Sequence, residues 1–151
     1  MKIIGISVIC FAVASYGFLY TLSISFRIKA LSEMIEFNLY FKNNIRFKSD
    51  DIISLFKDFK PKYNTFLKAY SNNFDLHIKE SSLNEAETAA ISAFLSELGK
   101  SDVIGQTEHC EHYITIFQRL KDDAKSELIE KGRLSKSLSL LASAALFILL
   151  I

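Results

Sequence analysis

The stretch Ile3–Phe26, IIGISVICFAVASYGFLYTLSISF, decides how this sequence folds, because its 24 consecutive residues carry no charge. As an α-helix the stretch would be about 36 Å long, whereas the hydrocarbon core of a bilayer is about 30 Å thick. Lys2 and Arg27 bound it on its two sides. We therefore predict that residues 1–26 form an N-terminal transmembrane helix.

A cleaved signal peptide is the alternative for this stretch. Ala12-Val13-Ala14 matches the small-residue pattern that precedes a signal-peptidase cut. The apolar run nevertheless continues from Ser15 to Phe26, which a cleaved peptide does not need. A retained anchor is the favoured interpretation.

The other end of the sequence is also apolar. Residues 137–151 number 15 and carry no charge, and only Ser139 and Ser143 interrupt the apolar run that begins at Leu138. As a helix this segment is about 22 Å long, shorter than the hydrocarbon core, although Lys136 can lengthen it by snorkelling. We predict a C-terminal transmembrane helix over residues 137–151, with a buried core helix as the alternative.

Basic residues flank the segment between the two predicted spans. They are Arg27 and Lys29 after the first span, and Lys131, Arg133 and Lys136 before the second. Because Lys and Arg accumulate on the cytoplasmic side of membrane spans, we expect residues 27–136 to be a cytoplasmic domain of a cell-membrane protein. The two cysteines, Cys10 and Cys110, are then not expected to form a disulfide.

Composition narrows the class of protein. The 18 Lys and Arg residues nearly balance the 17 Asp and Glu residues, which excludes a generically basic nucleic-acid binder. One proline and five glycines disfavour a turn-rich β-sandwich, and no Rossmann or P-loop glycine pattern is present. We predict an all-α helical bundle with a long C-terminal helix, flanked by the two transmembrane helices.

Helical spacing of apolar residues extends through the first half of the middle domain. The first span is expected to continue as one helix with this apolar stripe: Ile28, Leu31, Ile35 and Leu39. A second helix is predicted over 52–59, with Ser49 as its N-cap. Another apolar stripe, over 63–70, follows the only proline, Pro61.

Two helices joined by a tight turn are predicted in the second half of the domain. Ser82 and Glu85 have the spacing of a capping box, which places the start of a helix there. Gly99 lies where a glycine ends such a helix, and Ser101 or Asp102 then caps the last helix. Steps of three and four define the apolar seam of that last helix: Val103, Gln106, Cys110, Tyr113, Phe117, Leu120 and Ala124.

Charge is distributed unevenly along the domain. Residues 27–79 contain 10 basic and 6 acidic side chains, whereas residues 80–130 contain 4 basic and 11 acidic side chains. Solvated helix faces that neutralise one another are the simpler interpretation. The sharper one is an acidic surface that docks a basic partner, with Glu108 and Glu111 as its candidate residues.

One cluster carries metal-ligand residue types, Glu108-His109-Cys110-Glu111-His112. Two of its side chains could share a metal on one helix face, but a tight site would need ligands from another helix. His77 is the only other histidine. We interpret the cluster as a solvated face and assign no catalytic, cofactor or metal residue. A metal-dependent helical enzyme is the alternative to a protein without enzymatic activity.

The stretch from Phe94 to Gln106 resembles a motif of the stage III sporulation protein AB family. The residues that match that family's F-x-x-x-L-G-x-S-D-x-x-x-Q turn are Phe94, Leu98, Gly99, Ser101, Asp102 and Gln106. The plan of a 110-residue helical domain between two terminal spans is also similar. In the last span, Ser139, Ala142 and Ser143 replace glycines of the family.

The resemblance implies a helical domain similar to that of the inner-membrane platform protein of type II secretion systems. It implies a non-enzymatic platform in the channel between mother cell and forespore, located in the mother-cell membrane around the forespore. The implied partners are a secretion-type ATPase like stage III sporulation protein AA, other channel membrane proteins and the lipid bilayer, and no nucleic acid. A small two-span protein of holin or toxin type is the alternative.

The turn itself has two interpretations. Gly99 and the cap at Ser101 or Asp102 have an ordinary structural role in a helix connection. Exposed loops at the end of a bundle are also frequent docking sites.

Overall fold

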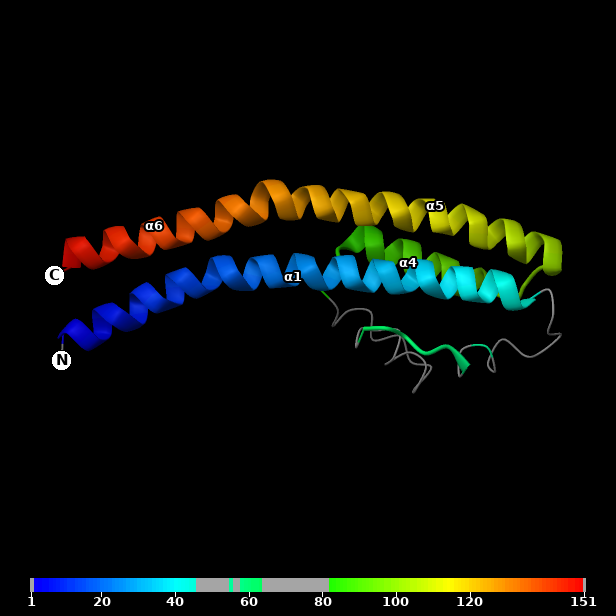
Figure 1. The fold of residues 1–151 in the computed structure, drawn as a ribbon, viewed down its shortest axis with the longest axis horizontal. Coiled ribbons are helices and arrows are strands. Elements are labelled where there is room, and N and C mark those ends of the chain that lie inside the picture. Colours follow the sequence, from blue (N-terminus) through cyan, green and yellow to red (C-terminus); the bar gives the residue numbers. More distant parts are fainter. Residues whose placement is uncertain (1, 46–54, 56–57, 64–81, 151) are drawn as a thin grey trace. The chain divides into compact units, whose positions relative to one another are not determined.

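The computed structural model describes residues 2–45, 55, 58–63 and 82–150 (Figure 1). Its helices are α1 (Lys2–Ile45), α4 (Glu85–Glu97), α5 (Val103–Glu127), the π-helix η2 (Leu128–Gly132) and α6 (Arg133–Leu150). Every one of these elements is helical, which confirms the all-α class for the described part of the chain.

Several sequence predictions fall on the remaining residues. Most of the helix expected over 52–59, its cap at Ser49, most of the stripe over 63–70, and His77 lie outside the described residues. The expected continuation of the first apolar stretch is confirmed, because α1 runs without a break from Lys2 to Ile45.

The chain divides into two compact units. Unit 1 consists of Met1–Ser25 and Ala124–Ile151, and unit 2 consists of Phe26–Asp123. The first part of α1 therefore belongs to unit 1 and the rest of it to unit 2. The boundary after Ser25 falls where the uncharged stretch of the sequence ends.

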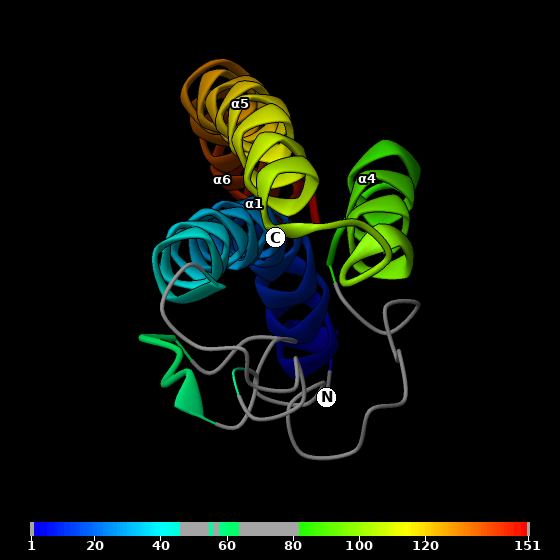
Figure 2. The same ribbon diagram turned by 90° about the vertical axis from the view of Figure 1, so that its right-hand side faces the viewer.

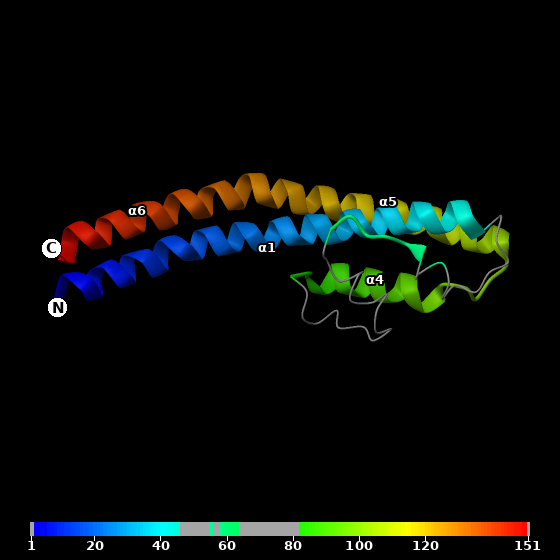
Figure 3. The same cartoon turned by 60° about the horizontal axis from the view of Figure 1, so that its bottom comes forward.

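Unit 1 is an antiparallel helix pair, in which the first part of α1 runs beside α6 (Figures 1 and 3). The closest approach is at Gly17. A Cβ atom built on Gly17 would lie 2.7 Å from the carbonyl oxygen of Ser135 and closer still to the Oγ of Ser139. Because the Ser135 oxygen belongs to the backbone of α6, it cannot yield as a side chain can. Small residues allow this kind of backbone approach, which is typical of helix pairs in membranes.

Hydroxyl groups near this contact bond to their own helices. Thr21 Oγ1 donates to the carbonyl oxygen of Gly17 at 2.9 Å, and Ser25 Oγ donates to that of Thr21 at 2.9 Å. Ser139 Oγ donates to the carbonyl oxygen of Lys136 at 3.1 Å. Each of these hydroxyl protons is satisfied within its helix, so the hydroxyl can lie beside an apolar neighbour at low cost.

The π-helix η2 changes the register of the long C-terminal helix. Along α5, the fully buried positions Cys110, Phe117 and Ala124 recur every seven residues. The next buried position is Gly132, eight residues further on. A π-turn inserts one extra residue into a helix, which accounts for the shift. The predicted long final helix is confirmed, and Gly132 shifts its register without breaking it.

The outward faces of unit 1 carry large apolar side chains. Those more than half exposed include Phe11, Phe18 and Leu19 of α1 and Leu140, Leu141 and Ile148 of α6. Over the residues that the structure describes, no helix combines the length and the apolarity needed to cross a membrane.

Unit 2 packs the second part of α1, α4 and most of α5 around one core (Figure 2). Phe37 comes from α1, Phe94 from α4 and Phe117 from α5, and all three are fully buried. The ring of Phe94 lies edge-on to Phe37 at 6.3 Å and edge-on to Phe117 at 5.9 Å between centroids. One aromatic ring thus joins all three helices through favourable edge-to-face contacts.

Two positions of the predicted apolar stripes are wrong. Leu39 is 43% exposed, and the buried stripe of α1 passes through Phe37, Asn38 and Phe41 instead. Val103 is 46% exposed because it is the first residue of α5 and precedes the packed part of that helix. The rest of the seam is confirmed, since its residues from Gln106 to Ala124 are buried or half-buried.

The predicted capping box of α4 is two residues too early. Asn84 is the N-cap instead, and its Oδ1 accepts a hydrogen bond from the backbone N of Glu87 at 2.8 Å. The Glu87 carboxylate accepts one from the backbone N of Asn84 at 2.8 Å. Ser82 and Glu85 have the same spacing, but Glu87 is buried and also has an ion-pair partner in α1, Arg27, which selects the later position.

Gly17→Ala tests the close contact in unit 1. Alanine is roughly 1 kcal/mol better than glycine inside a helix, so helix propensity alone would raise stability. We expect a lower melting temperature of the full chain in detergent micelles, because the new methyl group collides with the Ser135 backbone. Circular dichroism at 222 nm follows the transition.

Gly132→Ala is the matched control. Its Cβ would meet only the flexible end of Leu128, at 3.3 Å, and Thr21 Cγ2, at 3.6 Å. A Gly17→Ala protein as stable as the Gly132→Ala protein would contradict the close contact.

Candidate functional site

The turn between α4 and α5 contains the motif that the sequence singled out. Leu98 is the C-cap of α4 with extended backbone angles, and Gly99 follows with a φ of 82°. This left-handed conformation favours glycine because a Cβ atom would clash with the backbone. The backbone N of Lys100 then donates to the carbonyl oxygen of Glu97 at 3.3 Å, which closes the turn. The predicted role of Gly99 is confirmed.

Asp102 caps the start of α5. Its Oδ1 accepts a hydrogen bond from the backbone N of Gly105 at 2.9 Å, as an N-cap side chain does. Ser101 has a different task, since its Oγ accepts a hydrogen bond from Gln106 Nε2 at 2.8 Å. The structure thereby decides between the two caps that the sequence left open.

Gln106 braces the turn from inside. Its side chain is almost fully buried, and Nε2 also approaches the carbonyl oxygen of Glu97 at 3.4 Å. Gln106 therefore ties the end of α4 and the connecting loop to the first turn of α5. Phe94 belongs to the core, as described for unit 2, so the motif residues at its two ends hold the turn rather than face a partner.

The middle of the turn is exposed. Gly99, Lys100, Ser101 and Asp102 all face solvent, and they are followed by two exposed branched apolar side chains. Val103 is 46% exposed and Ile104 is 70% exposed. An exposed apolar pair on a rigid turn is a physical reason to expect a partner there. The apolar spacing predicts Val103 in the core seam and gives no role to Ile104.

Ile104 lies on the same face of α5 as two acidic residues. Residues four and then three positions further along a helix lie on the same face, and here these are Glu108 and Glu111. All three side chains are exposed. We call these residues, Ile104, Glu108 and Glu111, the docking strip. Glu111 also makes an ion pair with Lys42 of α1, with 3.0 Å between Nζ and Oε1.

The side chains of the five consecutive residues 108–112 do not point toward a common site. His109 stacks on Phe94 with 5.3 Å between ring centroids, and its Nε2 lies 3.2 Å from the carbonyl oxygen of Phe94. Cys110 is fully buried, and burial raises the pKa of its thiol to about 11. His112 and Glu111 are exposed. Over the described residues, no group of three or more His, Cys, Asp or Glu side chains is arranged to hold a metal ion.

An ion pair that the sequence did not predict joins α1 to α4. Arg27 Nη2 lies 2.8 Å from Glu87 Oε1, and Arg27 Nε donates to the same carboxylate at 3.1 and 3.2 Å. The Glu87 side chain is almost fully buried. Arg27 was interpreted only as a basic flank of the first span, because the spacing in the sequence does not reveal a partner 60 residues away.

A buried carboxyl group, Glu33 of α1, was also missed. It is fully buried; Oε1 accepts a hydrogen bond from the backbone N of Tyr63, and Oε2 has no hydrogen-bond partner among the residues that the structure describes. Burial raises the pKa of Glu33 to about 7, the hydrogen bond from Tyr63 opposes this rise, and nearby Glu36 adds to it. No signal in the sequence separates Glu33 from an ordinary surface glutamate.

These features define a small all-α protein with an exposed, internally braced turn between two of its helices. The family model for stage III sporulation protein AB (spore_III_AB) matches residues 51–151, two thirds of the chain, and the chain belongs to this family. The resemblance drawn from the Phe94–Gln106 stretch is thus confirmed, and so is the expected link to sporulation. No curated protein and no solved structure matches the chain.

Gly99→Val tests the conformation of the turn. A β-branched residue at positive φ costs on the order of 1–2 kcal/mol, so we expect a lower free energy of unfolding of the full chain by about that amount. Gly99→Asn should lose less, because asparagine tolerates this conformation better. Urea unfolding followed by circular dichroism measures the difference, with the exposed Lys100→Val as control. Equal stabilities of Gly99→Val and Lys100→Val would contradict the assigned conformation.

Glu33 makes stability depend on pH. Its pKa is raised from 4.5 to about 7 by folding, so the folded state binds an extra proton between these values. Stability should therefore fall as the pH rises from about 4.5 to about 7, and this contribution levels off above that range. Glu33→Gln is neutral throughout, so we expect it to remove the fall and to stabilise the chain by up to about 3 kcal/mol at pH 8.

Urea unfolding at pH 5 and pH 8 provides the measurement. Glu36→Gln, an exposed neighbour on the same helix, is the control and should keep most of the fall, because Glu36 adds less to the pKa of Glu33 than burial does. If Glu33→Gln loses as much stability between the two pH values as the wild type, the carboxyl is not buried in the protonated form.

Proposed function

We propose that this chain is a non-enzymatic membrane adaptor of the sporulation channel between mother cell and forespore, and that it docks a cytoplasmic secretion-type ATPase. Membership of the stage III sporulation protein AB family supports the sporulation context. The docking strip supports the proposed binding of an ATPase, since it places an exposed apolar side chain and two acidic side chains on one helix face.

The membrane part of the proposal rests on the sequence. Two uncharged runs, Ile3–Phe26 and residues 137–151, are proposed to span the mother-cell membrane around the forespore. The basic residues on their inner flanks favour a cytoplasmic location for residues 27–136. The exposed apolar side chains of unit 1 suit contact with lipid and with other membrane proteins of the channel.

An adaptor of this kind has a physical rationale. A motor in the cytoplasm can act on an assembly across the envelope only through a partner embedded in the membrane. The turn beside the docking strip begins at Gly99 and is braced by Gln106, so little conformational entropy would be lost when a partner binds. Ile104 supplies apolar area at the centre of the contact, and Glu108 and Glu111 supply a rim for a basic partner surface.

The test measures binding of the full chain, in lipid nanodiscs, to a purified secretion-type ATPase of the same channel, stage III sporulation protein AA. Ile104→Asp should weaken binding about tenfold or more, as the loss of a central apolar anchor does. Glu108→Lys should slow association and flatten its salt dependence. Glu108 is the better position for a charge reversal, because reversal of Glu111 would also break its ion pair with Lys42.

Ala89→Asp provides the matched control. It also places an acid on an exposed face of unit 2, but on α4 and away from the docking strip. Equal binding by wild type, Ile104→Asp and Glu108→Lys would exclude the docking strip. A wild-type chain that does not bind the ATPase at micromolar concentrations would contradict the proposed function.

A further inference from the structure

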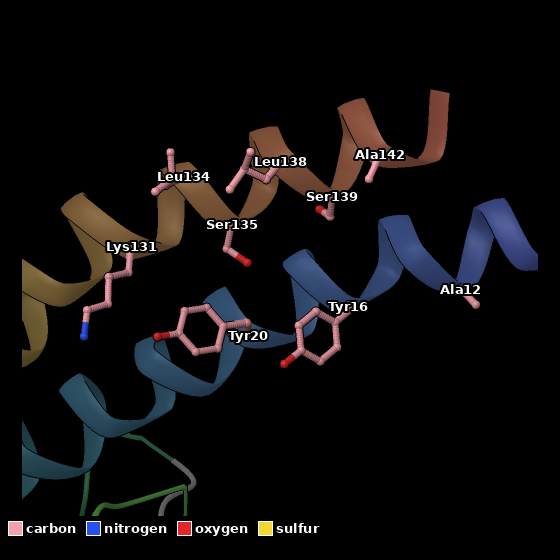
Figure 4. A pocket seen from close by; sticks show the side chains of 9 residues that line it. All are labelled: Ala12, Tyr16, Tyr20, Lys131, Leu134, Ser135, Leu138, Ser139 and Ala142. Carbon is pink, nitrogen blue, oxygen red and sulfur yellow. The ribbon is translucent and has the colours of Figure 1, made fainter. Parts of the chain in front are cut away.

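A groove of about 840 Å³ runs along the helix pair of unit 1 (Figure 4). On the α1 side it is lined by Ala12, Tyr16 and Tyr20. The opposite side begins at Lys131 in η2 and continues along α6 to Ala142. The close approach at Gly17 brings the two backbones together along this pair, and Ser135 and Ser139 line the groove where they meet.

The groove changes from polar to apolar along its length. At one end, Tyr20 donates a hydrogen bond to Glu127 Oε1 at 3.1 Å, and Lys131 Nζ lies 3.8 Å from the same oxygen. At the other end the lining residues are Leu138, Ala142 and Ala12, together with Ser139, whose hydroxyl bonds to its own helix (Figure 4). An occupant that fits both ends therefore has a polar head and an apolar tail.

The length of the groove matches one leaflet of a bilayer. Lys131 and Ala142 are eleven positions apart in a continuous helix, which corresponds to about 16 Å. Half of a hydrocarbon core of about 30 Å is about 15 Å. A transmembrane helix of another protein would need a contact surface twice as long, and it would bring apolar side chains against Lys131.

Basic side chains outnumber the one acidic partner at the polar end. Lys131 lines the groove, the Lys136 ammonium is 5.7 Å from the centre of the Phe18 ring across the pair, and Glu127 is the carboxylate that Lys131 approaches. Arg133 lies nearby in the sequence but does not line the groove. Anionic headgroups of the cytoplasmic leaflet attract such clusters, and each basic residue contributes about fivefold to affinity.

We propose that this groove binds one anionic phospholipid, with the phosphate at Lys131 and an acyl chain between Tyr16 and Leu138. The site rests on the proposed membrane location of unit 1, and it goes beyond the adaptor role by naming a lipid class that the helix pair selects. The Tyr20 hydroxyl and Lys131 face the headgroup, and the apolar part of the groove holds the chain.

Single tryptophans can test the site, because the natural chain contains none. Leu138→Trp places the probe in the groove, whereas Leu140→Trp places it outside the groove at nearly the same depth, two positions along α6. Both full-length variants are reconstituted in equimolar phosphatidylglycerol and phosphatidylcholine, with either one or the other lipid brominated. Brominated chains quench tryptophan on contact, so the two quenching levels give the lipid composition around each probe.

We expect brominated phosphatidylglycerol to quench the groove probe with a relative affinity about fivefold above that of phosphatidylcholine, and the control probe to show no preference. Adding Lys131→Gln to Leu138→Trp should abolish the preference. Adding Arg133→Gln instead removes the same charge outside the groove and should retain most of it.

Three results would overturn the site. Equal quenching of both probes by both lipids would leave the membrane location intact but exclude lipid selection. A groove probe that no lipid quenches, beside a control probe that lipid does quench, would show that protein, such as a second copy of the chain, covers the groove. If no lipid quenched either probe, both the site and the proposed membrane location would fail.

Discussion

The ion pair between Arg27 and Glu87 is the interaction on which unit 2 depends. Glu87 is almost fully buried, and its carboxylate accepts hydrogen bonds from both Arg27 and the N-cap residue Asn84. One side chain therefore starts α4 and holds that start against α1. Losing either charge would leave its partner buried and uncompensated, which is among the costlier changes in a protein interior. With the start of α4 held, Phe94 lies in the core and the turn after Gly99 is presented at the other end of α4.

Unit 1 depends on a steric constraint instead. The two backbones meet at Gly17, where even a Cβ atom would collide with the carbonyl oxygen of Ser135. The π-turn in η2 shifts the buried positions of the long helix by one residue, from the repeat of Phe117 and Ala124 to Gly132. Serines in α6, which stand where the resemblance led us to expect glycines, still allow the contact because glycine is supplied by α1. The groove proposed to hold a phospholipid lies along this close-packed pair.

The turn and the docking strip differ, because the first has a structural role and the second a proposed one. Gly99, Asp102 and Gln106 hold the backbone, and Phe94 fills the core. The side chains proposed to contact a partner, above all Ile104 and Glu108, lie beside these residues and are exposed. The motif residues therefore have structural roles, while the residues proposed to contact a partner are their neighbours.

Local physics determined what the sequence could predict by itself. Uncharged length, apolar spacing and the glycine and aspartate of the turn act over a few residues, so the all-α class, the unbroken α1, the long last helix and the role of Gly99 followed from the sequence. Only the tertiary structure decided which of two equivalent capping boxes starts α4, that Arg27 is paired, that Glu33 is buried and that Gly17 faces Ser135. These depend on which helix faces meet across tens of residues of chain, and nothing in the spacing of one helix encodes the face of another.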